Sequence, residues 1–205
     1  MPRPRSLSPD RLAAAALAVL DRDGLTGLSM RTVAKELGMS TMALYRYVDG
    51  REELEGMVVE LVLSSVDTTP PADPSAPWRE RIAVMLGRMR DAVGRHPAVI
   101  PLTPAHRHSA PTILRWSETV LALLAEAGYE GERRVVALRA LVGYLIGAIQ
   151  LEHQGPLSGA GTVELGELPR DSFPLLADTA RHARRVPADR EFFGGLDILL
   201  RGLGD

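Results

Sequence analysis

The sequence predicts an all-α fold, and three features of composition and patterning support that prediction. Hydrophobic residues make up 45% of the 205 residues, with Ala and Leu abundant, which is enough apolar material for a sizeable folded core. Aromatic residues account for only 4%, and β-branched runs of alternating polarity, typical of strands, are scarce. Apolar residues instead recur at helical spacing in segments that Gly and Pro separate.

The first helix is predicted to begin at Ser8 and to end at Gly24. Ser8 is a good N-cap, Pro9 suits the first helical position, and Asp10 complements the positive end of the helix dipole. The apolar face of this helix repeats at helical spacing through Leu12, Ala15, Ala16, Val19 and Leu20.

Residues 29–48, SMRTVAKELGMSTMALYRYV, read as two short helices joined by a tight turn. Gly38 stands at the turn, where a residue without Cβ adopts positive φ at little cost, and Ser40 or Thr41 is expected to cap the second helix. The inward-facing residues are expected to be Ala34, Leu37, Leu44 and Val48. The exposed residues are expected to be Thr41, Met42, Tyr45, Arg46 and Tyr47. A short helix that exposes such groups after a tight turn is typical of proteins that read the DNA major groove.

The next part of the chain is predicted to hold three helices and two breaks. A fourth helix is expected to start at Asp49, with Glu52 at capping-box spacing. Four prolines in residues 68–77 forbid a regular helix there. Amphipathic helices are then expected over about 78–94 and 111–127. His96-Pro97 is expected to stop the first of them, and Gly128 to close the second.

The longest helix is predicted over about 131–153, where Gly143 and Gly147 lie four residues apart on one side. Glycine costs about 1 kcal/mol in a helix interior, so the pair suggests close packing of another helix. The Gly-rich residues 155–172 are predicted to form a mobile loop. Two further helices are expected over about 173–185 and 189–203.

Several classes of protein are disfavoured by what the sequence lacks. The absence of cysteine rules out disulfides, thiol catalysis and zinc–thiolate sites. The N-terminal residues MPRPRSLSPD have no apolar signal core, and no apolar run is expected to be long enough to span a bilayer. A cytoplasmic protein is therefore expected. No nucleophile–base pair, phosphate-cradling loop or metal-ligand cluster is recognisable, so we expect no enzyme activity, no cofactor and no metal.

Charge is distributed unevenly along the chain. Through residue 51, eight Arg and Lys side chains stand against five Asp and Glu side chains, a net charge of +3. Since the whole chain carries −2, the remainder carries −5. A basic N-terminal segment on an acidic body fits a protein whose N-terminal end faces phosphate.

Residues 8–63 strongly resemble the DNA-binding domain of the TetR family of bacterial transcriptional repressors. The resemblance rests on DGLTGLSMRTVAKELGMSTMALYRYVDGREEL, where the LG-x-S turn, the LYRYV helix and D-x-R-E-E-L occur together. The C-terminal half resembles the tetracycline-repressor branch through GYLIGAI at 143–149, Glu152-His153 and FGGLD at 193–197. The resemblance implies a homodimeric repressor that a ligand releases from DNA.

The resemblance also implies roles in DNA binding for individual residues. Base-facing positions fall on Arg31, whose planar fork matches the O6 and N7 atoms of guanine, and on Thr41, Met42 and Ala43. Phosphate-backbone positions fall on Ser29, Tyr45, Tyr47 and Arg51. Arg3 and Arg5 are expected to reach neighbouring phosphates or the minor groove. Two alternatives stay open: Tyr45 as a half-buried structural residue, and Arg51 paired with Glu55 one turn away.

The same resemblance implies a dimer interface between the helices at 131–153 and 189–203. Two such helices from each subunit would make a four-helix bundle. The residues expected there are Gly143 and Gly147, for close approach, and Phe192, Leu196, Leu199 and Leu203, to fill the seam. The alternative is an ordinary core within one chain.

An effector pocket is expected among the helices between residues 78 and 153. The candidate apolar and aromatic walls are Met85, Met89, Trp116 and Tyr144. The candidate polar contacts are His96, His106, His108, Gln150 and His153. A metal site at His106 and His108 is not expected, because their spacing places them on opposite sides of a helix. Leu151 falls where tetracycline repressors have a glutamate, so an apolar or amphipathic molecule is expected instead of tetracycline.

The predicted organisation has three parts. Residues 1–50 are expected to form the helix-turn-helix DNA-binding domain, about 50–66 a connecting helix, and 67–205 the effector-binding and dimerisation domain. The expected function is that of a ligand-responsive regulator, released from a palindromic operator by a small molecule. Its partners would be double-stranded DNA, an unknown effector and a second copy, with no membrane. An architectural or activating DNA-binding protein is the main alternative, and a helical enzyme the lesser one.

Overall fold

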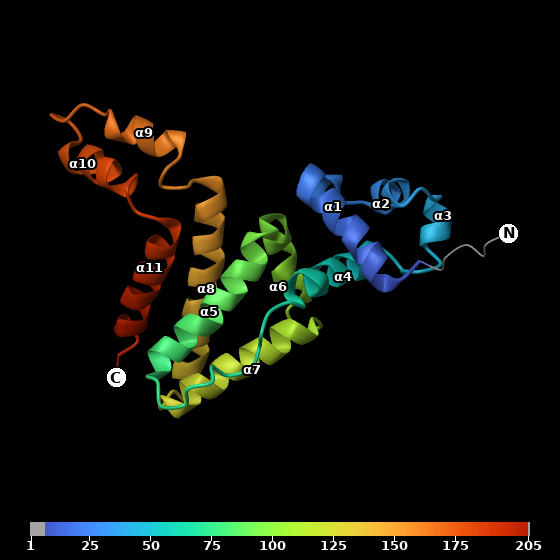
Figure 1. The fold of residues 1–205 in the computed structure, drawn as a ribbon, viewed down its shortest axis with the longest axis horizontal. Helices are drawn as coiled ribbons and strands as arrows, with labels where there is room; N and C mark the ends of the chain where they lie inside the picture. The colour runs from blue at the N-terminus through green and yellow to red at the C-terminus, as the bar shows by residue number, and fades with distance from the viewer. Residues whose placement is uncertain (1–6, 205) are drawn as a thin grey trace. The chain divides into compact units, whose positions relative to one another are not determined.

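The computed structural model describes residues 7–204, which form α-helices and one 3-10 helix and contain no strand (Figure 1). The all-α prediction is confirmed. By compactness the chain divides into unit 1, residues 1–69 and 91–119, and unit 2, residues 70–90 and 120–205.

Unit 1 contains the N-terminal helices and a helical turn from the middle of the chain. Its elements are α1 (Pro9–Gly27), α2 (Met30–Glu36), α3 (Thr41–Leu44), α4 (Arg51–Leu63), η1 (Pro97–Leu102), α6 (Thr103–His106) and the start of α7 (Pro111–Glu126). Helix α1 packs against α2 and α4, and η1 packs against α1 and α4. The core includes the fully buried Leu12, Leu20, Leu44 and Leu54. Burial of these large aliphatic side chains holds the short α2 and α3 in place.

Helix α1 begins as predicted and ends differently. The Ser8 hydroxyl accepts a hydrogen bond from the Arg11 N–H, with a separation of 3.3 Å. Gly24 has φ 68° and ψ −175°, so the helix breaks there, but a further helical turn follows and ends at Gly27. The sequence therefore located the break and missed the turn after it.

The start of α4 also differs from the prediction. Gly50 is the N-cap and Asp49 is not, and no side chain caps this end. The Asp49 N–H instead donates to Oε2 of Glu53 at 2.6 Å. Glu53, and not the predicted Glu52, is thus the residue whose carboxylate reaches back to the start of the helix. The reason is that the helix starts one residue later than expected.

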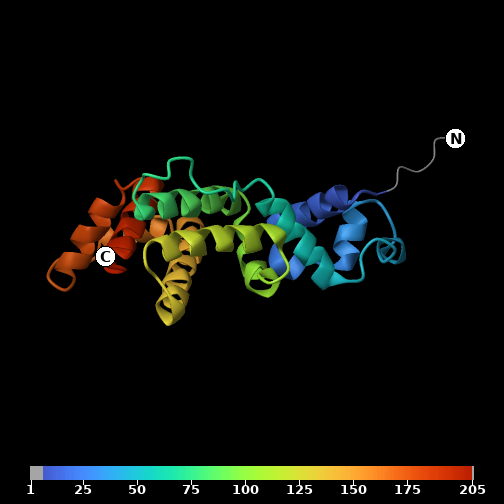
Figure 2. The ribbon, with the colours of Figure 1, turned by 90° about the horizontal axis from the view of Figure 1, so that it is seen from below.

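Unit 2 is built around two long helices and the C-terminal helix. Its elements are most of α5 (Trp78–Gly94), the end of α7, α8 (Gly131–Gln154), α9 (Ala160–Gly166), α10 (Pro174–Ala183) and α11 (Ala188–Gly202). Ile82, Met85 and Leu141 are fully buried, and α8 packs against α11. Residues 155–172 were predicted as a loop, but they contain α9, which lies against α10 (Figures 1 and 2).

Helix α8 is long and apolar enough to cross a membrane, with mean hydropathy 1.6 over its most apolar window. This finding corrects the expectation that no apolar run in the chain reaches that length. Only 22% of that window is buried within the chain. One helix of this kind is weak evidence for a membrane span, because a helix covered by another protein chain has the same composition.

Candidate nucleic-acid interface and effector body

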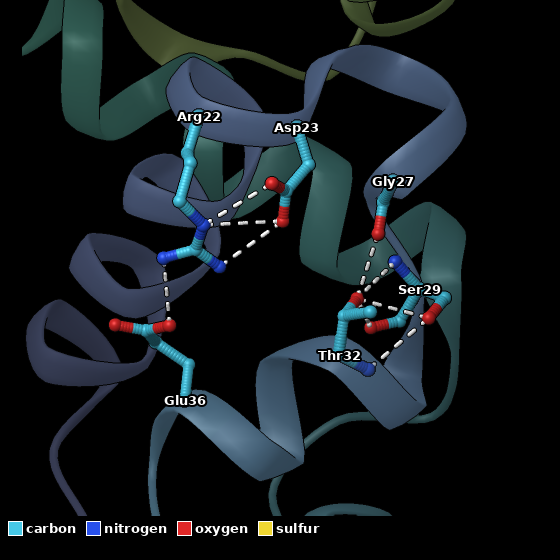
Figure 3. A network of polar contacts seen from close by, with 6 residues as sticks. All are labelled: Arg22, Asp23, Gly27, Ser29, Thr32 and Glu36. Atoms are coloured by element: carbon cyan, nitrogen blue, oxygen red, sulfur yellow. Dashed lines mark hydrogen bonds and ion pairs between the residues drawn. The ribbon is translucent and has the colours of Figure 1, made fainter.

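Three local features hold the helix-turn-helix in shape. Ser29 and Thr32 form a reciprocal cap at the start of α2: the Ser29 N–H donates to Thr32 Oγ1 at 3.0 Å, and the Thr32 N–H donates to Ser29 Oγ at 3.1 Å. The Thr32 hydroxyl also donates to the Gly27 carbonyl at 2.8 Å (Figure 3). Gly38 has φ 68°, and Ser40 Oγ accepts from the Ala43 N–H at 3.2 Å. The predicted turn and the Ser40 cap are both confirmed.

Helices α1 and α2 are also joined by an exposed ion-pair network around Arg22. Its guanidinium lies 3.1 Å from Asp23 and 3.0 Å from Glu36 of α2 (Figure 3). Hydrogen bonds to Asp23, and then to Glu36, raise the pKa of Arg22 above its ordinary value. Arg22 of α1 is thereby tied to Glu36 at the end of α2.

The face predicted to meet DNA is exposed. Met42 is 77% exposed, Tyr45 48% and Tyr47 43%, and Arg31 and Arg46 are exposed as well. Helix α3 is only four residues long, so the two tyrosines stand in the turn that follows it. Leu44 and Val48 are buried beneath this face. Large apolar and aromatic groups held in water above a small core indicate a binding surface.

Two of the predicted phosphate contacts also have partners within the chain. Ser29 is the N-cap of α2, so its hydroxyl is already engaged. The Nε atom of Arg51 lies 2.6 Å from Oε1 of Glu55, and its NH2 atom donates to the Leu25 carbonyl at 3.3 Å. The pairing of Arg51 with Glu55, left open by the sequence, is therefore present. Arg3 and Arg5 lie outside the described residues.

The residues predicted to line one effector pocket are divided between the two units. Trp116 is buried in unit 1 and Met85 and Met89 are buried in unit 2. His96 Nδ1 lies 2.7 Å from Oδ2 of Asp21, a polar contact within unit 1. Gln150 is half-buried, and His153 is exposed near the end of α8.

Two hollows contain the remaining members of the predicted set. One in unit 1, of about 760 Å³, lies between the start of α4 and residues 106–111, and both His106 and His108 line it. The other, of about 340 Å³, lies between α8 and α11 in unit 2. Its lining residues include Gly143, Tyr144, Gly147, Leu151 and Phe192. His106 ends α6 and His108 follows it in a turn, so the two are not on opposite sides of one helix as expected.

The α8–α11 hollow has a half-buried tyrosine, Tyr144, and a buried arginine, Arg90, beside it. The Tyr144 hydroxyl donates to the carbonyl of Phe192. Burial raises the pKa of Tyr144 above its ordinary value, and the negative charge of Glu191 adds to this shift. Arg90 of α5 binds Glu152 of α8 and Asp189 of α11. Burial alone lowers the pKa of Arg90, but hydrogen bonds to these two carboxylates outweigh it, and the pKa is raised.

Two residues of the predicted dimer interface are largely covered by their own chain. Phe192 is 2% exposed, although it lines the α8–α11 hollow, and Leu196 is fully buried. Leu199 and Leu203 are partly exposed, as is Gly147, and Gly143 is exposed. The exposed apolar residues on the two helices are Val135, Val136 and Leu151 on α8 and Phe193 and Ile198 on α11. Helical periodicity alone did not distinguish the face of α11 that meets its own chain from the face that remains open.

Within residues 7–204, no group of three or more His, Asp or Glu side chains is arranged to hold a metal ion.

Comparison with known proteins identifies similar sequences over most of the chain. The profile described as bacterial regulatory proteins, tetR family, matches residues 12–54. The profile described as tetracyclin repressor-like, C-terminal domain, matches residues 70–205. The repressor DrrR1 of Streptomyces coeruleorubidus is 35% identical over 98% of this chain and 78% of its own length. The class E tetracycline repressor of Escherichia coli is 27% identical over 96% of this chain and 90% of its own.

Solved structures show the same fold. ActR of Streptomyces coelicolor in complex with actinorhodin has a TM-score of 0.79 and 28% identity, over 98% of this chain and 96% of its own. A possible TetR-family regulator from the same organism has a TM-score of 0.81 and 27% identity, over 96% of this chain and 98% of its own.

Proposed function

The chain belongs to the TetR family of bacterial transcriptional regulators, and from this premise we propose how its own residues carry out ligand-responsive repression. It is a DNA-binding repressor that responds to a ligand. We infer that it binds a palindromic operator as a homodimer and that a small molecule releases it. The observation that best supports this proposal is the exposed face formed by Met42, Tyr45, Tyr47 and Arg31 on a capped helix-turn-helix.

The proposed DNA contacts divide into residues that read bases and residues that hold the phosphate backbone. Arg31 and the start of α3, with Thr41, Met42 and Ala43, enter the major groove, and Arg31 contacts guanine. Tyr45, Tyr47 and Arg51 hold phosphates. Ser29 contributes through its cap, which fixes the start of α2.

The proposed dimer forms through α8 and α11. On α8, Val136, Gly143, Gly147 and Leu151 recur at spacings of seven, four and four residues, so they share one face. Glycines on that face let a second helix approach closely, and the α8–α11 hollow offers space for an apolar side chain of the partner. Ile198 is 75% exposed on α11 and is the largest apolar contribution expected from that helix. A two-fold dimer suits a palindromic operator because each half-site binds the helix-turn-helix of one subunit.

The proposed effector is an apolar or amphipathic small molecule. ActR binds actinorhodin and (S)-DNPA, and these complexes support a small organic ligand for this chain as well. In unit 2 the proposed contact residues are Met85, Met89, Tyr144, Gln150 and His153, and in unit 1 they are Trp116 and His106. His96 is a weaker candidate, because its ring already pairs with Asp21.

The proposed mechanism is a shift between two populations of the dimer. The ligand favours a distance between the two DNA-binding domains of the dimer that no longer matches one turn of DNA. Helix α4 transmits this change. The family consists of regulators, and we propose that this chain has no enzymatic activity. A screen for turnover of any bound ligand tests that point, and product formation would contradict it.

The experiment that tests the proposal selects an operator from a random duplex library and measures the stoichiometry of the complex. We expect an inverted-repeat consensus and two protein chains per duplex, measured by sedimentation velocity. A consensus without two-fold symmetry, bound by one chain, would contradict the dimer and the palindrome together.

A further inference from the structure

His106 is a buried side chain whose polar atom lacks a partner. It is the last residue of α6 and is 5% exposed, and its Nε2 atom has no hydrogen-bond partner in the described structure. The ring lies against α4 at Gly56, where a Cβ atom would stand only 3.2 Å from Nδ1 of His106. Because a buried polar atom without a partner costs free energy, its presence calls for an explanation.

The charged group beside His106 is Glu55. Its Oε2 atom lies 3.8 Å from Nε2 of His106, which is beyond hydrogen-bond distance but within the range of an ion pair. The other oxygen of the same carboxylate, Oε1, lies 2.6 Å from Nε of Arg51. One half-buried carboxylate therefore stands between a buried imidazole and the arginine proposed to hold a DNA phosphate.

Other titratable groups near His106 have different partners or face solvent. Helix η1, which packs on α6, carries no titratable side chain. On α4, Glu53 accepts from the Asp49 N–H, Glu60 accepts from Thr112, and Glu52 is exposed. Arg107 and His108 follow His106 in the chain and are both exposed. Glu55 is thus the acid through which a charge on His106 acts.

We propose that His106 is a positioning residue for the DNA contact of Arg51 and acts through Glu55. When His106 takes up a proton from solvent, the imidazolium pairs with Glu55 and the carboxylate is shared between two cations. The Arg51 guanidinium is then less neutralised and available to phosphate. When the imidazole is neutral, the Glu55 carboxylate pairs with Arg51 and not with His106. This inference rests on the proposed phosphate contact of Arg51.

The proposal has a measurable signature in the salt dependence of DNA binding. Each phosphate that a cationic side chain neutralises adds about 0.9 to the slope of log affinity against log salt concentration. Imidazole changes charge between about pH 5 and pH 8. The slope should therefore be steeper by about 0.9 near pH 6 than near pH 8 if Arg51 is released by protonation of His106. A side chain with a purely structural role would not move this slope with pH.

The experiment measures affinity of the full-length protein for the selected operator duplex over a series of salt concentrations at both pH values. The variants are His106→Asn, His106→Gln, Glu55→Gln and Arg51→Ala, with His108→Asn as the control for a nearby exposed imidazole. Circular dichroism verifies that each variant is folded, and two His106 variants guard against misfolding of one. We expect the steeper slope near pH 6 in the wild type and in His108→Asn. The slope should be shallow at both pH values in the His106 variants and steep at both in Glu55→Gln.

Three results would overturn the inference, and only the third also overturns the proposed phosphate contact of Arg51. If Arg51→Ala lowers the slope while the His106 variants keep the full pH response, Arg51 contacts phosphate and His106 does not control it. If Glu55→Gln keeps the wild-type pH response, the carboxylate is not the link. If Arg51→Ala leaves the slope unchanged at both pH values, the proposed contact of Arg51 fails, and the inference about His106 fails with it.

Discussion

Arg90 and Glu152 form a two-point ion pair, with Nε 3.0 Å from Oε2 and NH2 3.1 Å from Oε1. The Arg90 side chain is only 7% exposed and lies over the ring of Phe192, with 4.8 Å between Cζ and the ring centroid. Its third contact, to Asp189, is 2.8 Å long. One arginine thereby ties α5, α8 and α11 together beneath the hollow that opens between α8 and α11.

Replacing Glu152 with Ala should therefore destabilise the protein strongly. The change leaves a buried guanidinium without its two-point partner, which costs about 3–5 kcal/mol. Asp189→Ala is the matched control, because the Asp189 side chain is 82% exposed and its loss should cost about 1 kcal/mol or less. Urea denaturation measures both, and equal losses would show that Arg90 is not held mainly by Glu152.

Replacing Tyr144 with Phe should change how stability depends on alkaline pH. Because burial raises the pKa of Tyr144, the folded state keeps its proton at pH values where the unfolded chain loses it, above about pH 10. Stability should therefore fall as pH rises beyond that point. The Phe variant should lose about 1 kcal/mol near neutral pH and show a weaker alkaline fall. An unchanged dependence of stability on alkaline pH would show that the Tyr144 hydroxyl is not its source.

Replacing Gly143 with Ala distinguishes a dimer seam from an open helix face. An added Cβ at Gly143 meets no atom within 4 Å in the single chain, so the helix alone should gain about 1 kcal/mol. At a close helix–helix contact, the same methyl group should instead weaken dimerisation, as measured by sedimentation equilibrium. Gly161→Ala in α9, also open, is the control. If the Gly143→Ala variant dimerises fully and is more stable, Gly143 does not lie at the dimer interface.

Replacing Arg31 with Ala should cost about 1–3 kcal/mol of binding to the selected operator and little on random DNA. The reason is that a guanine contact contributes only where the guanine is present. Arg46→Ala is the comparison, since Arg46 is exposed nearby but is not expected to read a base. Equal losses on both duplexes for Arg31→Ala would assign it to phosphate instead of base.

The sequence predicted those elements whose causes are local. The Ser8 and Ser40 caps, the turn at Gly38 and the bounds of α5 follow from short-range chemistry that one sequence displays. The helix α9 was missed because residues 155–172 are rich in glycine, and its packing against α10 compensates for weak helix propensity.

The site was predictable to a lesser degree, because burial depends on tertiary contacts. Phe192 and Ile198 lie on the same helix, and only the folded chain shows that the first is buried and the second exposed. The contact of Glu55 with both Arg51 and His106 joins residues about fifty positions apart. The proximity of Glu55 to Arg51 along one helix was a visible signal, whereas nothing in the sequence indicated that His106 lies beside Glu55.

The most direct test of ligand-responsive repression is fluorescence anisotropy of a labelled operator duplex bound by the full-length protein. A small molecule that raises the melting temperature of the free protein is titrated into the complex. We expect anisotropy to fall as ligand binds, with operator affinity reduced at least about tenfold, equivalent to about 1.4 kcal/mol of coupling. A ligand that binds tightly and leaves operator affinity unchanged would contradict the account.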